Sequence, residues 1–116
     1  MKITKNFNLQ EFDCRDGSQV PQEYMHNVTK LCENLQVLRE HINKPIIVIS
    51  GYRSPEYNTK IKWAKKSQHM LAKAADIVVP GMTSLEVRNI ILELIKEGKM
   101  CKGGVGIYPT FTHYDV

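Results

Sequence analysis

The fold is decided by residues 67–80, which read SQHMLAKAADIVVP. Ala74 to Val79 predict a strand that ends at Pro80-Gly81, because apolar and β-branched residues fill it and turn residues follow. Asp76 lies inside this apolar segment, and His69 lies seven residues earlier, in the loop before the strand. A buried carboxylate is costly unless it is paired or binds a metal. Asp76 is therefore either a salt-bridge partner or a metal ligand.

A second pair of candidate ligands lies near the end of the chain. His113 and Asp115 are two residues apart in a predicted strand, so their side chains project to the same face of a sheet. Two imidazoles and one carboxylate would leave a fourth position open on tetrahedral zinc, which is the pattern of a catalytic site. The spacing alone is a loose pattern with many chance matches.

Arg53 follows another predicted strand, in a tight Gly-Tyr-Arg-Ser turn. Beside a metal, its guanidinium would bind a substrate carboxylate or a developing oxyanion. Taken alone, it is an ordinary loop arginine in solvent. His26 and His41 lie within a predicted helix, where a polar surface position explains both.

The hydrophobic pattern predicts a small α+β domain with a mostly antiparallel sheet and two main helices. Apolar residues at spacings of three and four mark the first main helix, and Thr83 with Glu86 forms a capping box before the second. The expected elements are an irregular segment over 1–19, a helix over 21–42, a buried strand over 46–49, a short helix over 55–63, a strand over 74–79, a helix over 84–97, and a hairpin of strands over 105–108 and 111–116.

Length and composition fit one domain over residues 1–116, with 42% hydrophobic and 24% charged residues. No apolar run approaches the roughly 20 residues needed to cross a bilayer, so we expect no membrane insertion. The first twelve residues contain no apolar segment of the kind found in secretory signals. The three cysteines are widely spaced and without a CxxC motif, which predicts reduced thiols.

The net charge is +4, and the densest basic cluster contains Lys60, Lys62, Lys65 and Lys66. A basic balance is compatible with nucleic acid, an anionic membrane or an acidic polymer. A solvated face explains the cluster better, because no recognition helix or stacking pattern of aromatic residues accompanies it. We therefore expect no nucleic-acid partner.

Four segments resemble one known family in the same order along the chain. They are SGYRSPEYN at 50–58, SQHMLAKAAD at 67–76, GGVGIYP at 103–109 and FTHYD at 111–115. Together they resemble the zinc D-Ala-D-Ala carboxypeptidase family, whose fold is shared with hedgehog signalling domains. Within that family, the resemblance is to the short single-domain members common in bacteriophages and bacteria, and it covers about residues 7–116.

The resemblance implies roles for individual residues. It places Arg53 beside the metal, where it helps to hold the substrate carbonyl or carboxylate, and it makes Ser67 a hydrogen-bonding residue near the site. Asp115 would orient a zinc-bound histidine by accepting its other N–H. The implied zinc ligands are His69, Asp76 and His113.

Two positions depart from the family pattern. Ala72 stands where the family usually has glycine, and a positive φ there would cost alanine about 1 kcal/mol. Thr110 stands where several branches place a general base, which leaves Asp115 as the candidate substitute for that base. Tyr57 and Trp63 lie near the candidate arginine, where they would either line a substrate groove or pack as a lid.

The resemblance therefore implies a zinc-dependent metallopeptidase that hydrolyses D-amino-acid-containing bonds of peptidoglycan stem peptides. It would act as a D-Ala-D-Ala carboxypeptidase or as an endolysin-like endopeptidase. The alternative is a catalytically inactive zinc-binding or interaction module of the same fold. We expect a monomer whose partner is a stem peptide or a D-Ala-D-Ala peptide. Without a signal peptide, it would stay in the bacterial host cytoplasm until lysis, or be carried in a virion if phage-encoded.

Overall fold

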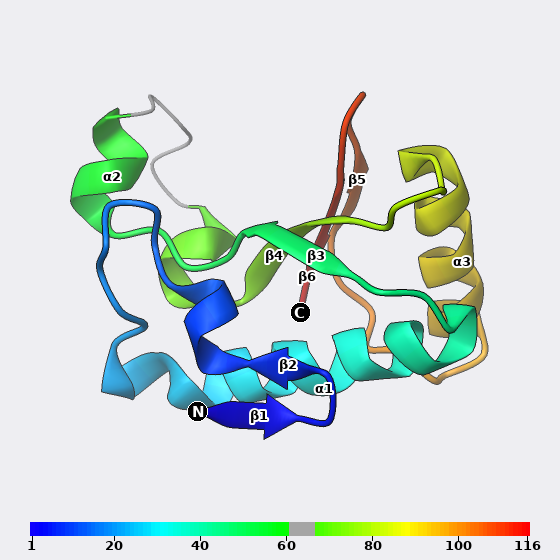
Figure 1. Cartoon of the computed structure of the whole chain (residues 1–116), viewed down its shortest axis with the longest axis horizontal. Coiled ribbons are helices and arrows are strands. Elements are labelled where there is room, and N and C mark those ends of the chain that lie inside the picture. The colour runs from blue at the N-terminus through cyan, green and yellow to red at the C-terminus, as the bar shows by residue number, and fades with distance from the viewer. Residues whose placement is uncertain (61–66) are drawn as a thin grey trace.

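The computed structural model describes residues 1–60 and 67–116 and shows an α+β arrangement (Figure 1). Four antiparallel strands form one sheet in the order β3-β4-β6-β5, and two further strands pair as a small N-terminal hairpin. The strands are β1 (Lys2–Thr4), β2 (Phe7–Asn8), β3 (Ile47–Ser50), β4 (Ala74–Val78), β5 (Val105–Ile107) and β6 (Thr112–Asp115). The expected fold class is confirmed.

The two main helices begin and end where local chemistry favours it. The longer one ends at Ile42, because Asn43 adopts a left-handed φ of 52°. The other begins after Thr83, whose side chain accepts a hydrogen bond from the Glu86 N–H in the expected capping box. The helices are α1 (Met25–Ile42), α2 (Pro55–Lys60) and α3 (Ser84–Lys96), and the 3-10 turns are η1 (Leu9–Phe12), η2 (Gln22–Tyr24) and η3 (Gln68–Leu71).

The core lies between the sheet and the two main helices. In Figure 1, α1 runs along one side of the sheet, and α3 stands beside the end that carries β5. Burying each large aliphatic side chain stabilises the fold by about 1.5–3 kcal/mol. The fully buried large side chains of these elements are Val28, Leu31, Leu35 and Leu38 of α1, Ile91 and Leu94 of α3, Ile77 of β4 and Tyr114 of β6.

Alternation along β6 divides its residues between the core and the opposite face. Thr112 and Tyr114 are buried, whereas His113 and Asp115 are half-buried. Because neighbouring residues of a strand point to opposite faces, the core fixes the direction of the two polar side chains. The tyrosine hydroxyl, whose own burial raises its pKa, donates to the Cys101 carbonyl at 2.7 Å. This bond satisfies the polar end of a buried ring.

The N-terminal region is more ordered than the sequence predicts. Residues 1–19 were expected to be irregular, but they contain β1, β2 and η1. These strands are too short to show a period, and contacts from distant residues hold them. Gln36 of α1, for example, accepts hydrogen bonds from Thr4 Oγ1 at 3.0 Å and from the Asn6 N–H at 2.9 Å.

The expectation of a buried strand over 46–49 is wrong in part. The strand exists as β3, but it lies at the edge of the sheet, and Ile47 is 49% exposed. A short apolar run does not distinguish an edge strand from a central one. The first main helix begins at Met25 rather than at residue 21, because the 3-10 turn η2 precedes it.

Some expectations fall outside the described residues. These are the last part of the predicted short helix, residues 61–63, with Trp63, and most of the predicted lysine face, Lys62, Lys65 and Lys66. Within the described ranges, none of the helices combines the length and the apolar content required for a bilayer crossing. All three cysteines are free thiols, as expected, and His26 and His41 are exposed.

Replacing Thr83 with alanine should lower the free energy of unfolding by about 1 kcal/mol, because α3 loses its N-terminal cap. Thr83→Ser keeps the hydroxyl and should unfold close to wild type. Urea denaturation followed by circular dichroism measures both changes. Equal stability of the alanine variant and wild type would show that the capping box contributes nothing.

A candidate metal centre beside a cleft

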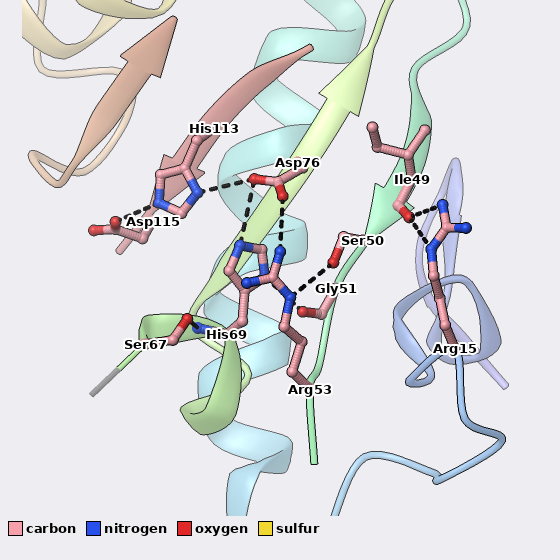
Figure 2. Close-up of polar contacts among 10 residues, drawn as sticks. All are labelled: Arg15, Ile49, Ser50, Gly51, Arg53, Ser67, His69, Asp76, His113 and Asp115. Atoms are coloured by element: carbon pink, nitrogen blue, oxygen red, sulfur yellow. Dashed lines mark hydrogen bonds and ion pairs between the residues drawn. The ribbon is translucent and has the colours of Figure 1, made fainter. Parts of the chain in front are cut away.

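The polar residues form one row across the sheet. Ser50 on β3 is the register partner of Asp76 on β4, which is also paired with His113 on β6. Gly106 on β5 completes the row opposite the histidine. Figure 2 shows that His113, His69 and Arg53 all reach the carboxylate of Asp76, with His113 to its left and the other two together below it. Strand register therefore brings together residues that are far apart in sequence.

Asp76 is 3% exposed and contacts three cationic or potentially cationic groups. Its Oδ1 lies 2.9 Å from Nδ1 of His113 and 3.3 Å from Nε2 of His69. Its Oδ2 lies 3.3 Å from Nη2 of Arg53. Burial favours the neutral acid, but the two histidines outweigh it and lower the pKa of Asp76 to about 2. The carboxylate is therefore ionised at neutral pH.

His69 is held from two sides. Its backbone N–H donates to Ser67 Oγ at 3.1 Å at the start of η3. Its Nδ1 lies 2.7 Å from the Gly51 carbonyl, which only accepts hydrogen bonds, so Nδ1 carries the proton in the neutral ring. A Cβ on Gly51 would lie 2.7 Å from Cα of Phe12, so the close packing of residue 51 against Phe12 requires glycine.

The Nε2 atom of His69 is suited to bind a cation. It is buried, and within residues 1–60 and 67–116 it has no hydrogen-bond partner. In the neutral ring its lone pair faces Oδ1 of Asp76, and two electron-rich atoms at 3.3 Å repel unless a proton or a metal ion lies between them. The arrangement is therefore the one expected of a histidine that binds a metal through Nε2.

His113 is oriented by Asp115. Nε2 of the ring donates to Oδ2 of Asp115 at 2.7 Å, which directs Nδ1 toward Asp76. The other oxygen of Asp115 accepts the Gly104 N–H at 2.8 Å. A Cβ on Gly104 would lie 2.5 Å from Oδ2, so glycine is needed here too. Burial opposes the charged ring, but the bonds to Asp115 and Asp76 raise the pKa of His113 to about 9.

The three candidate ligand atoms fit one metal ion. One ligand atom each from His69, Asp76 and His113 can be chosen so that all three lie within 4.8 Å of one another. Two imidazole nitrogens and a carboxylate oxygen suit a divalent transition metal, and three protein ligands leave a position open. The structure thus brings together the residues that the sequence nominated as a metal site.

Arg53 lies at the floor of an adjoining cleft. It is 5% exposed, and Nε lies 3.3 Å from Oγ of Ser50 while Nη2 contacts Asp76. Its backbone N–H donates to the His69 carbonyl at 3.0 Å, which joins the turn to η3. The cleft has a volume of about 300 Å³ and is lined by Arg15, Ile49, Ser50, Arg53, Tyr57, Asp76 and Phe111.

The other nominated residues occupy different places. Tyr57 lines the cleft, as one of its two expected roles requires, whereas Ser67 is buried and caps η3. Ala72 has φ 56°, so it adopts the conformation in which alanine is strained. Thr110 lines a separate small cavity beside α3.

Sequence reasoning missed four residues at this site, one of which is Ser50, whose hydroxyl contacts Arg53. The Gly51 carbonyl and the Gly104 N–H act through the backbone, and Arg15 reaches the cleft from the N-terminal region. The glycines lie in the motifs that carry the family resemblance, which was the available signal. No period or motif pointed to Arg15.

The sheet, the histidine–aspartate cluster and the buried arginine define a small α+β protein with a candidate metal centre at a cleft. The family model for Peptidase M15 matches residues 3–115, so the chain belongs to the peptidase M15 family. This membership confirms the resemblance found in the sequence.

The curated relatives carry a more specific name. The chain is 37% identical over 79 residues to the peptidoglycan L,D-endopeptidase MepK of Escherichia coli strain K12. The same values hold for MepK of Escherichia coli O157:H7 and of Shigella flexneri. Each match covers 62% of this chain but only 40% of the relative, so the matched region is less than half of those proteins. No solved structure matches the chain with significance.

Replacing His113 with alanine should abolish metal binding, because one of three ligand atoms is lost. Asp115→Ala should keep one site per chain but lower its affinity about 10–100-fold, since the ligand loses its orienting partner. Chelator competition measures both affinities, and His41→Ala on the surface of α1 is the matched control. An Asp115→Ala protein with wild-type affinity would contradict the orienting role.

Proposed function

We propose that this chain is a zinc-dependent metallopeptidase that hydrolyses bonds in the stem peptides of bacterial peptidoglycan. The observation that carries the proposal is the convergence of His69 Nε2, Asp76 Oδ1 and His113 Nδ1 beside a cleft with a buried arginine. Imidazole and carboxylate ligands favour zinc among the common metals. Membership of the peptidase M15 family supports the reaction, and the name of the curated relatives supports the substrate.

When bound, zinc would supply Lewis-acid polarisation of the scissile carbonyl and a hydroxide nucleophile near neutral pH. The protein's own groups hold the substrate in place. Arg53 is positioned by Ser50 and Asp76, and its guanidinium can donate to the substrate carbonyl oxygen as negative charge develops there. Because these partners fix the guanidinium in advance, little reorganisation is needed during the reaction.

The described residues of the site offer few candidates for a general base. Both oxygens of Asp115 are engaged, by His113 and by Gly104, so we assign it a positioning role rather than that of a base. Thr110 lines another cavity. Among the described residues that line the cleft, Asp76 is the only carboxylate. This observation favours a second candidate function, a zinc-binding module without turnover.

Substituting Arg53 with alanine should lower kcat/KM on a stem peptide about 10²–10³-fold, because one stabilising donor is lost from the transition state. Arg53→Lys keeps the charge but not the planar fork, and should recover only part of the activity. Zinc content of each variant is the control, and it should stay near one ion per chain. Full activity of the alanine variant would remove Arg53 from the mechanism.

Digestion of purified peptidoglycan by the zinc-loaded protein separates the remaining possibilities. Mass spectrometry of the products distinguishes an internal cut at an L,D bond, which the relatives' name favours, from release of free D-alanine by a carboxypeptidase. Stoichiometric zinc without turnover on peptidoglycan or any stem peptide would support the binding module. Turnover by protein that is free of metal would contradict both candidates.

A further inference from the structure

Arg15 lies in a turn whose neighbouring residues, Cys14 and Asp16, both bond to Ser54, the residue before α2. Sγ of Cys14 accepts a hydrogen bond from the Ser54 N–H at 3.4 Å. Oδ2 of Asp16 accepts one from the Ser54 hydroxyl at 2.7 Å, and its Oδ1 accepts the Ser18 N–H at 2.8 Å. These bonds also lower the pKa of Asp16, so its carboxylate stays ionised and engaged. The backbone of Arg15 is therefore fixed beside the cleft.

The guanidinium of Arg15 is anchored along one edge and open along the other. Nε and Nη2 lie 3.0 and 2.6 Å from the carbonyl oxygen of Ile49, the residue before Ser50 on β3. Figure 2 shows this contact on the side of β3 away from the histidines. The side chain is exposed, and across residues 1–60 and 67–116 neither Nη1 nor the second N–H of Nη2 has a hydrogen-bond or ion-pair partner. This open edge has the geometry of a bidentate carboxylate site.

The charge of the cleft points to an anionic ligand. Its charged lining residues are Arg15, Arg53 and Asp76. Arg53 is buried and ion-paired with Asp76, and this carboxylate also faces the candidate metal centre. Of the cleft-lining residues that the structure describes, Arg15 is thus the cation that remains available to a ligand.

We propose that Arg15 binds a free carboxylate of the peptide substrate, on the side of the cleft away from the candidate metal centre. This inference rests on the proposed function for the identity of the ligand as a peptide. It assigns Arg15 to specificity and not to bond breaking, because the residue lies beyond Arg53 from the metal ligands (Figure 2). Peptides in which the carboxylate bound by Arg15 is amidated should therefore be poor substrates.

The test uses the zinc-loaded protein and a set of synthetic stem peptides in which each free carboxylate is amidated in turn. Wild type should prefer one free carboxylate over its amide by about tenfold or more in kcat/KM, the range expected for a charge-assisted bidentate contact. Arg15→Gln should abolish this preference, because kcat/KM on the free-carboxylate peptide falls to about its value on the amidated one. Arg15→Lys should retain part of it.

Arg39→Gln is the matched control, because it removes the same charge from α1 and does not line the cleft. If Arg15→Gln lowers the rates on both peptides equally, or if wild type has no carboxylate preference, the inference is overturned while the proposed function stands. If wild type cleaves no peptide, the proposed function fails. Isothermal titration of the zinc-loaded proteins with the same peptide pairs then tests Arg15 separately. The inference requires that wild type binds the free carboxylate more tightly than its amide and that Arg15→Gln loses this difference.

Discussion

The structure of the site depends on one buried carboxylate, that of Asp76. An ionised group that is 3% exposed would be strongly destabilising without compensation. Arg53 compensates one oxygen, and the two histidine rings face the other. Because a guanidinium already pairs with Oδ2, the oxygen directed at the histidines is the one available to a metal. The ion pair that compensates the buried charge of Asp76 thus also leaves one of its oxygens free to bind a metal.

The rest of the fold keeps these partners in place. Register across β3, β4 and β6 sets Ser50, Asp76 and His113 in one row. Backbone groups of two glycines then fix the surroundings: Gly51 sets the tautomer of His69, and Gly104 holds the carboxylate that orients His113. A Cβ on Gly51 would collide with Phe12, and one on Gly104 would collide with the carboxylate of Asp115. The candidate centre is therefore built mainly by the sheet and by backbone atoms, which are more rigid than surface side chains.

Much of this arrangement could be predicted from the sequence. The periods of α1 and α3 and the apolar strands indicate the fold class, and alternation puts His113 and Asp115 on one face of a sheet. The full His-Asp-His set was implied by the family resemblance. The N-terminal hairpin could not be predicted, since its strands have three and two residues and depend on Gln36. Nor could the position of Arg15, which depends on contacts between Asp16 and Ser54 across 38 residues. Ile47 is exposed because β3 is an edge strand. An apolar run in the sequence does not reveal where its strand lies in the sheet.

The most direct test is a crystal structure of the zinc-loaded protein with the ion located by anomalous scattering at the zinc edge. The account predicts one ion per chain, bound by Nε2 of His69, an oxygen of Asp76 and Nδ1 of His113 at about 2.0–2.2 Å. His113 should still donate from Nε2 to Asp115. An ion bound elsewhere, or one bound without any of these three residues, would contradict the claim that Asp76 and its two histidines form the metal centre.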